Sequence, residues 1–171
     1  FANPSAFYSR SKYAADIVLS DLPGVAVVRL RMPIDGVPEP RNLIYKLAAY
    51  PKIIDVENSV SVVDDLVNAI KGLIEKRGAG IFHAVNEGRM KHRDLMRLYE
   101  EIVDPVHTNE WIPNDDLVKL GLATRGRSNC FLQNTRLKAL GIPMRPIEVA
   151  LRDCMEKYAV ALITQKQNAS V

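Results

Sequence analysis

Hydrophobic positions along the chain follow two patterns, one typical of helices and one typical of buried strands. In residues 66–76, 91–103 and 146–163 apolar side chains recur every three or four positions, which predicts amphipathic helices. The runs Val25–Arg31 and Gly80–Val85 are short and largely apolar, as in parallel strands that are covered on both faces. Helices that alternate with such strands predict an α/β fold.

Local signals mark the other expected elements. Asn3 can cap a helix whose first turn accepts Pro4, and Pro23-Gly24 ends that helix just before the first strand. The polar loop Pro33–Pro40 is long enough to line a site, and residues 164–171 are expected to be frayed. Further helices are expected at 42–50, 114–120 and 134–140, and further strands at 52–56 and 59–63.

Charge is balanced along the chain. Its 171 residues hold 23 Lys and Arg and 20 Asp and Glu, a formal net charge of +3, without a dense basic block. Neither nucleic acid nor a membrane is therefore expected as a partner, and the apolar runs are far shorter than the roughly 20 residues of a membrane helix. No secretory signal opens the chain, so a cytoplasmic protein is expected. Position 1 is Phe rather than Met, which suggests a piece of a longer protein.

Neither the cysteines nor the histidines form a metal-binding pattern. Cys130 and Cys154 make no disulfide framework, and Cys154 falls on the apolar face of the last helix, where a core position is expected. His83, His92 and His107 have no partner at ligand spacing, and His83 is expected to be a hydrogen-bonded core residue. No metal site is expected.

Several charged residues have simple structural interpretations. Asp64 and Asp65 open a helix, where acidic side chains suit the helix dipole. Arg29 and Arg31 alternate along a strand, so one of them is expected to form a structural ion pair. These residues need no catalytic role.

Tyr8 and Lys12 stand four residues apart on the first expected helix, so their side chains share one face. A phenol with a pKa near 10 is a poor proton donor at neutral pH, but a nearby ammonium favours the phenolate and lowers that pKa. By itself the pair also fits a surface Lys beside a half-buried Tyr. Its helix, however, leads directly into a strand that ends at Met32-Pro33, where a parallel sheet presents a cofactor crevice.

The chain resembles the extended short-chain dehydrogenase/reductase family. Tyr8-Ser9-Arg10-Ser11-Lys12 is similar to the family's Tyr-x-x-x-Lys motif, and Val27–Pro33 follows at the expected distance. The likeness runs over roughly residues 7–158. Within the family the chain is similar to deoxysugar-nucleotide reductases, the branch that includes dTDP-4-dehydrorhamnose reductase. It looks most like the plant-type UDP-4-keto-6-deoxyglucose 3,5-epimerase/4-reductases. The stretches that carry this branch-level likeness are Arg31–Ile34, Pro40–Asn42, Asn58-Ser59 and Arg127–Asn129.

The resemblance implies roles for matching residues. Tyr8 would be the general acid that protonates the C4 oxygen of the substrate. Lys12 would hydrogen-bond the nicotinamide ribose and lower the pKa of Tyr8. The turn at Met32-Pro33 would pass the carboxamide end of an NADP or NAD cofactor. Polar contacts to the nucleotide sugar would come from Arg41, Asn42, Arg127, Ser128 and Asn129, with solvated loop cations as the alternative for both arginines.

Two parts of the family pattern are missing. The only Gly-x-Gly, Gly78-Ala79-Gly80, precedes a strand and is expected to end a helix, so it is not the Gly-rich turn that holds a pyrophosphate. The catalytic Ser or Thr that comes well before the Tyr is absent too. We therefore expect the C-terminal part of a Rossmann-like doubly wound parallel sheet with a small α/β substrate-binding lobe. Residues 1–34 and 57–103 are assigned to the dinucleotide-binding domain, and 35–56 and 104–171 to the lobe and C-terminal helix.

The resemblance implies an NAD(P)H-dependent reduction of a 4-keto-6-deoxy nucleotide sugar in rhamnose-type biosynthesis, with 3,5-epimerisation left open. The expected partners are the nucleotide sugar and a missing N-terminal half of the same protein, without which the fragment would be inactive. Two alternatives stay open: a non-catalytic nucleotide-binding or regulatory subunit with the same fold, and an NAD-dependent nucleotide-sugar epimerase or dehydratase. A homodimer is also open, because helices beside the active-site helix often pair in this family.

Overall fold

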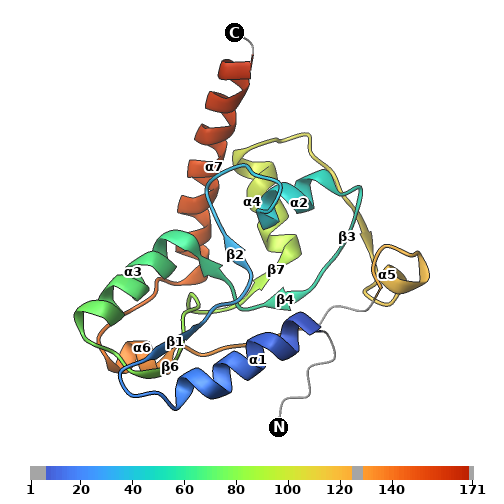
Figure 1. Cartoon of the computed structure of the whole chain (residues 1–171). Helices are drawn as coiled ribbons and strands as arrows, with labels where there is room; N and C mark the ends of the chain where they lie inside the picture. The colour runs from blue at the N-terminus through green and yellow to red at the C-terminus, as the bar shows by residue number, and fades with distance from the viewer. Residues whose placement is uncertain (1–6, 125–128, 170–171) are drawn as a thin grey trace.

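Short pairs of strands with helices packed around them organise the chain in the computed structural model, which describes residues 7–124 and 129–169 (Figure 1). The helices are α1 (Phe7–Ser20), α2 (Leu43–Ala49), α3 (Val63–Glu75), α4 (His92–Ile102), α5 (Asp116–Lys119), α6 (Thr135–Ala139) and α7 (Ile147–Ala169). The strands are β1 (Ala26–Arg29), β2 (Pro33–Ile34), β3 (Lys52–Ile54), β4 (Glu57–Asn58), β5 (Ser61–Val62), β6 (Gly80–His83), β7 (Met90–Lys91) and β8 (Glu110–Ile112).

Parallel pairing joins strands that are distant in sequence. β1 runs parallel to β6 with Ala26 opposite Gly80 and Arg29 opposite His83. β2 pairs in parallel with β5, and β3 with β8, whereas β4 and β7 are antiparallel. Parallel strands require a crossover connection, and α2 and α3 lie between β1 and β6 in the chain. The expected parallel α/β arrangement is therefore confirmed.

The largest hydrophobic core lies where α2, α4 and α7 meet. Leu95 and Met96 of α4 are fully buried against Met155 and Tyr158 of α7, and α4 and α7 lie against each other in Figure 1. Cys154 belongs to the same core, as expected, and its burial raises the pKa of the thiol to about 12. The proposed boundary at residue 103 stays a prediction; these contacts place α4 in one core with the C-terminal helix.

A second core joins α3 to β6 and α6. Leu73, Phe82 and Leu137 are buried there, and Gly78 follows the end of α3 and leads into β6, as expected from the Gly-x-Gly sequence. His83 differs from expectation in one respect. Its Nδ1 lies 3.2 Å from the carbonyl oxygen of Gln133, so it is hydrogen-bonded, but the side chain is half-buried because the strand turns Phe82 inward instead.

Asp64 and Asp65 do more than suit a helix dipole. α3 begins at Val63, and its N-cap, Val62, has no side chain that could cap it. Asp65 is buried and accepts a 2.8 Å hydrogen bond from Nε of Arg145, while Asp64 forms an ion pair with Lys157 of α7. The pair of acids therefore fastens the start of α3 to the C-terminal helix and the segment before it. This corrects the expectation that capping alone explains them.

The expectation of frayed residues after Ile163 is wrong for the described part of that segment. α7 continues to Ala169 and extends beyond the body of the molecule (Figure 1). Within this extension the Thr164 hydroxyl donates to the carbonyl of Val160 at 3.0 Å. Gln165 and Lys166, which follow Thr164, are good helix formers, so their intrinsic propensity favours continuation of the helix.

Candidate active site

Helix α1 lies beside β1 and runs in the opposite direction (Figure 1). An ion pair fixes this arrangement, because Nε of Arg29 donates to the Asp16 carboxylate at 2.7 Å. This confirms the expected structural ion pair on the strand. Since the helix and the strand run in opposite directions, the start of α1 lies at the carboxyl end of β1. That end is where parallel sheets form ligand crevices.

Tyr8 and Lys12 occupy this start of α1 on a common face. The Lys12 ammonium Nζ lies 5.7 Å from the centre of the Tyr8 ring. Both side chains are exposed, Tyr8 by 71%, so a ligand can reach the phenol and the ammonium together. The pair therefore presents a phenolic hydroxyl, which can donate a proton, and an ammonium group on one accessible face of the helix.

The chain leaves β1 through a strained turn. Met32 has φ of 43°, a left-handed value that is uncommon for a residue with a side chain. Backbone strain of this kind costs about 1–3 kcal/mol and persists only where the surrounding structure enforces it. Such residues are found most often at ligand-binding and active sites. The Met32 side chain packs against the main core, and Pro33 begins β2 opposite Ser61. This turn is the expected neighbour of the cofactor.

The amide and hydroxyl groups of Ser61 hold the chain at Arg31, just before the turn. The Ser61 amide donates to the carbonyl of Arg31 at 2.8 Å, and the Arg31 amide donates to the Ser61 hydroxyl at 3.1 Å. The same hydroxyl donates to the carbonyl of Ala84 at 2.6 Å. Ser61 is fully buried. It therefore links the end of β1 to the chain that follows β6.

Arg41 and Asn42 differ in their surroundings. Arg41 is exposed just before α2. Asn42 is buried and caps α2, because its Oδ1 accepts from the Ile44 amide at 3.1 Å. Its Nδ2 donates to the carbonyl oxygens of Asp35 and Val37. These three hydrogen bonds hold the loop before α2 and the start of the helix in place. Asn42 would therefore shape this loop, and a direct contact between Asn42 and a sugar stays a prediction.

The expected substrate residues near position 128 are described only in part. Arg127 and Ser128 lie outside the described residues, and Asn129 is exposed. The chain after Asn129 is firmly held, since the Cys130 amide donates to Oδ1 of Asn58 at 2.9 Å. Arg31 donates to that same oxygen. A segment from the C-terminal part of the chain thus lies beside the end of β1.

No hydrogen bond or ion pair joins Tyr8 or Lys12 to another expected site residue within the described ranges 7–124 and 129–169. The structure nevertheless places the Met32 turn and the segment after Asn129 together, through residues that the sequence had not assigned. Asn58 and Ser61 are the main ones. Their partners are far away in sequence, and only the likeness at Asn58-Ser59 could have drawn attention to that part of the chain.

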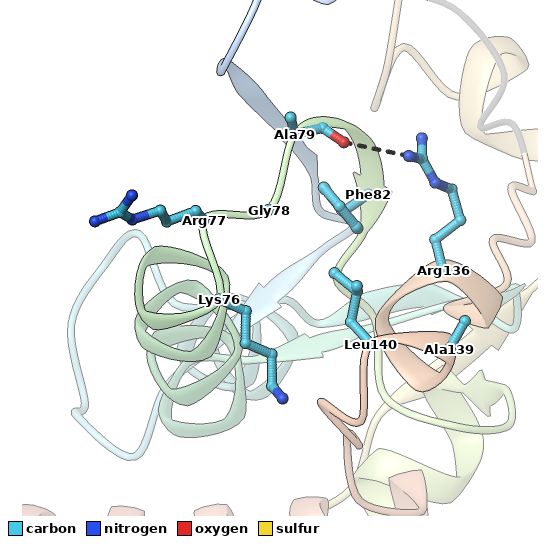
Figure 2. Close-up of a pocket in the computed structure, with 8 residues that line it drawn as sticks. All are labelled: Lys76, Arg77, Gly78, Ala79, Phe82, Arg136, Ala139 and Leu140. Atoms are coloured by element: carbon cyan, nitrogen blue, oxygen red, sulfur yellow. Dashed lines mark hydrogen bonds between the residues drawn. The ribbon is translucent and has the colours of Figure 1, made fainter.

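A cavity of about 290 Å³ lies elsewhere, at the amino end of β6 (Figure 2). Three cations line it, but they do not converge on one point. Figure 2 shows Arg77 pointing away from the cavity, while Arg136 donates to the carbonyl oxygen of Ala79 at 3.2 Å. Phe82 and Leu140 occupy the space between α3 and α6. This hollow is therefore not the candidate active site.

Within residues 7–124 and 129–169 the structure shows neither a cluster of metal ligands nor a membrane-spanning helix. In the part of the chain that the structure describes, no three His, Cys, Asp or Glu side chains are grouped so that they could hold a metal ion. None of the helices, as far as the structure describes them, is both long and apolar enough to cross a membrane.

No protein-family model matches the chain, but individual proteins do. The chain is 31% identical over 134 residues to the bifunctional dTDP-4-dehydrorhamnose 3,5-epimerase/dTDP-4-dehydrorhamnose reductase of Arabidopsis thaliana, a match that covers 78% of this chain and 44% of that protein. Two crystal structures are similar in fold. The L780 UDP-rhamnose synthase of Acanthamoeba polyphaga mimivirus has a TM-score of 0.75 at 24% identity, covering 86% of this chain and 50% of that one. RMD from Pseudomonas aeruginosa, complexed with NADPH, has a TM-score of 0.67 at 18% identity, covering 94% and 58%.

These similarities define the class of protein first. The chain shares the Rossmann-like α/β fold of these two structures. By sequence the chain is similar to proteins named as dTDP-4-dehydrorhamnose and UDP-4-keto-L-rhamnose reductases, so the expected resemblance is confirmed. The chain spans about half the length of these relatives.

Proposed function

We propose that this chain supplies the proton donor and part of the substrate pocket of an NAD(P)H-dependent reductase that acts on a 4-keto-6-deoxy nucleotide sugar. The observation that carries the proposal is the pair formed by Tyr8 and Lys12, which lie on one face, accessible to solvent, at the carboxyl end of a parallel strand. A relative named as a dTDP-4-dehydrorhamnose reductase matches this chain in sequence, and a structure of similar fold contains NADPH.

The chemistry follows from where each group lies. The nicotinamide, when bound, supplies the hydride that C4 of the sugar receives. Tyr8 donates its phenolic proton to the C4 oxygen, so that a hydroxyl group forms without a free alkoxide. Lys12 stabilises the negative charge left on the phenol oxygen and donates a hydrogen bond to the ribose. The Met32-Pro33 turn would help to hold the carboxamide end of the cofactor.

The substrate side follows from the remaining expected residues. Arg127 and Arg41 would offer guanidinium groups, whose paired N–H donors suit a diphosphate. Ser128, Asn129 and Asn42 would contribute neutral donors and acceptors to the sugar or shape its pocket. The dinucleotide-binding part would comprise residues 1–34 and 57–103, and the substrate lobe residues 35–56 and 104–171.

The principal partner would be the rest of the same protein, which pairs with the outer edge of β1. The carbonyl oxygens of Val25 and Arg29 accept hydrogen bonds from the β6 side. Backbone groups alternate in direction along a strand. Those of Ala26 and Val28 therefore face away from β6, and in the described ranges β1 pairs with no other strand.

The outer edge of β6 is closed in a different way. Arg136 donates to the outward-facing carbonyl oxygens of Ile81 at 2.8 Å and Ala79 at 3.2 Å, and its guanidinium lies over the Phe82 ring (Figure 2). A charged side chain on an edge strand blocks further pairing. The sheet can therefore grow only beyond β1. A strand from the half of the protein that lies outside this chain fits this edge and would bring the Gly-rich turn.

Location and assembly follow the same proposal. A reductase that uses soluble nucleotide sugars and NAD(P)H would work in the cytoplasm. The exposed apolar residues of α1, among them Ile17 and Val18, would pack against the rest of the protein or against a second copy in a homodimer.

Replacing Tyr8 by Phe tests the proposed acid in the full-length protein that carries this chain. The Tyr8→Phe protein should lose at least about 100-fold in kcat for NADPH-dependent reduction of UDP-4-keto-L-rhamnose. The Kd for NADPH should change little, because only the transferable proton is removed. Tyr13→Phe, on the same helix, is the matched control and should retain normal turnover. Full activity of Tyr8→Phe would refute the assignment, and a sugar product formed without NADPH consumption would favour an epimerase.

A further inference from the structure

Three segments that are distant in sequence meet at a single carboxamide oxygen. Oδ1 of Asn58 accepts hydrogen bonds from Nε and Nη2 of Arg31, at 3.2 and 2.8 Å, and from the amide of Cys130 at 2.9 Å. The Asn58 side chain is only 2% exposed. A buried oxygen that accepts three hydrogen bonds, two of them from one charged guanidinium, restrains the groups that donate to it.

Ser59 extends this junction along the chain that follows Asn129. Its amide donates to the carbonyl of Cys130 at 3.1 Å. Its hydroxyl accepts from the Leu132 amide at 2.9 Å and donates to the Leu132 carbonyl at 3.3 Å. Ser59 is 1% exposed, so water does not compete for these bonds. The backbone of residues 130–132 is therefore held by the side chains of Asn58 and Ser59 and by the Ser59 amide.

The junction adjoins both sides of the proposed active site. Arg31 directly precedes Met32, the strained residue of the proposed cofactor turn. Cys130 directly follows Asn129, a proposed substrate contact. The Met32 turn and the segment at Asn129 are thus connected by two hydrogen-bonded links, from Arg31 to Asn58 and from Asn58 to Cys130.

We propose that Asn58 is a positioning residue, which holds the segment that begins at Asn129 against the end of β1. This proposal rests on the proposed reductase function, because the value of the position lies in aligning substrate and cofactor. Asn58 is buried and would act through Arg31 and the Cys130 amide. Its carboxamide oxygen is the required group, since both links end on that oxygen.

Asn58→Ala in the full-length protein removes the oxygen, and Asn58→Asp keeps an acceptor at the same place. Cys130 reports on the segment directly, because its thiol is partly buried beside the junction. Cys154 is the internal control: it is buried in the main core, with its thiol pKa raised to about 12, and reacts only if the core opens.

Release of the segment should accelerate iodoacetamide alkylation of Cys130 at least about fivefold in Asn58→Ala and less than about twofold in Asn58→Asp, as read by peptide mass spectrometry. Cys154 should stay unmodified in both. The KM for UDP-4-keto-L-rhamnose should rise about tenfold in Asn58→Ala, with kcat much less affected and activity restored in Asn58→Asp.

Different failures have different meanings. If Asn58→Ala leaves both Cys130 alkylation and the KM unchanged, the proposal is overturned. Faster Cys130 alkylation with an unchanged KM overturns the positioning role as well. If the unmodified protein does not reduce this sugar at all, the proposed function fails, while the Cys130 rates still support or refute the attachment of the segment. Alkylation of Cys154 in Asn58→Ala contradicts the proposal, because it would show that Asn58 maintains the core instead.

Discussion

The two ends of the chain contribute helices with opposite surroundings. α7 buries Leu151, Met155 and Tyr158 in the main core, whereas none of the residues of α1 is buried. Both helices carry apolar side chains, yet those of α1, such as Ile17, remain exposed to solvent. Hydrophobic burial is what makes a helix stable in a folded domain. The apolar, unburied surface of α1 therefore supports the proposal that another part of the protein covers this side of the molecule.

Truncating side chains on the two sides should have very unequal effects on the 171-residue chain. Leu95 of α4 is fully buried, so Leu95→Ala should lower the free energy of unfolding by about 2–5 kcal/mol through lost burial and a cavity. Ile17 is 51% exposed, so Ile17→Ala should change it by no more than about 0.5 kcal/mol. Urea unfolding of both variants measures this difference. Equal losses would show that α1 already belongs to a packed core.

A second pair of substitutions compares two carboxylates within the packed side. Asp65 has a side chain that is 8% exposed and pairs with Arg145, which is 37% exposed. Asp65→Asn should therefore cost about 2 kcal/mol, somewhat less than the 3–5 kcal/mol of a fully buried pair. Asp64 and Lys157 are both more than half exposed, so Asp64→Asn should cost less than about 1 kcal/mol. Thermal melts of the two isosteric variants give the comparison, and a larger loss in Asp64→Asn would contradict it.

Alkaline pH should weaken the packed side specifically. Desolvation raises the pKa of the Cys154 thiol from 9.0 to about 12 and that of the Tyr158 phenol from 10.0 to about 12. Both groups are neutral when protonated, and the folded state binds their protons more tightly. Their contribution is thus complete below pH 9 and is lost as the pH rises toward 12.

For the thiol alone the loss at pH 10 is about 1 kcal/mol. Cys154→Ala should therefore show a smaller fall in Tm between pH 8 and pH 10 than the unmodified chain. The same fall in both proteins would remove the thiol from the account and leave the alkaline sensitivity to Tyr158.

Much of the secondary structure could be predicted because its signals are local. The apolar spacing in 66–76, 91–103 and 146–163 predicts α3, α4 and most of α7, with differences at their ends. The end of α7 was missed because the polar residues after Ile163 carry no hydrophobic pattern, although their intrinsic helix propensity is sufficient. The strand runs were predicted slightly too long, since pairing with a partner, rather than composition, decides where a strand ends.

In the candidate site, too, local features could be predicted from the sequence and long-range contacts could not. Tyr8 and Lys12 are four residues apart, so helical geometry alone places them together, as found. Asp65 pairs with a residue 80 positions later, and Asn58 with one 72 positions later. No periodicity encodes such contacts, which arise only when the parallel strands have brought these segments together. The sequence therefore predicts the reactive pair but not the residues that hold its surroundings.

The outer edge of β1 is proposed to receive a strand from the rest of the protein. Amide hydrogen exchange in the full-length protein, resolved by residue, tests this proposal. The amides of Ala26 and Val28, which face away from β6, should exchange as slowly as that of Val27, which faces it, because both edges of β1 would be hydrogen-bonded. If Ala26 and Val28 exchange as fast as exposed loop amides while Val27 is protected, β1 is an open edge in the complete protein and the claim is wrong.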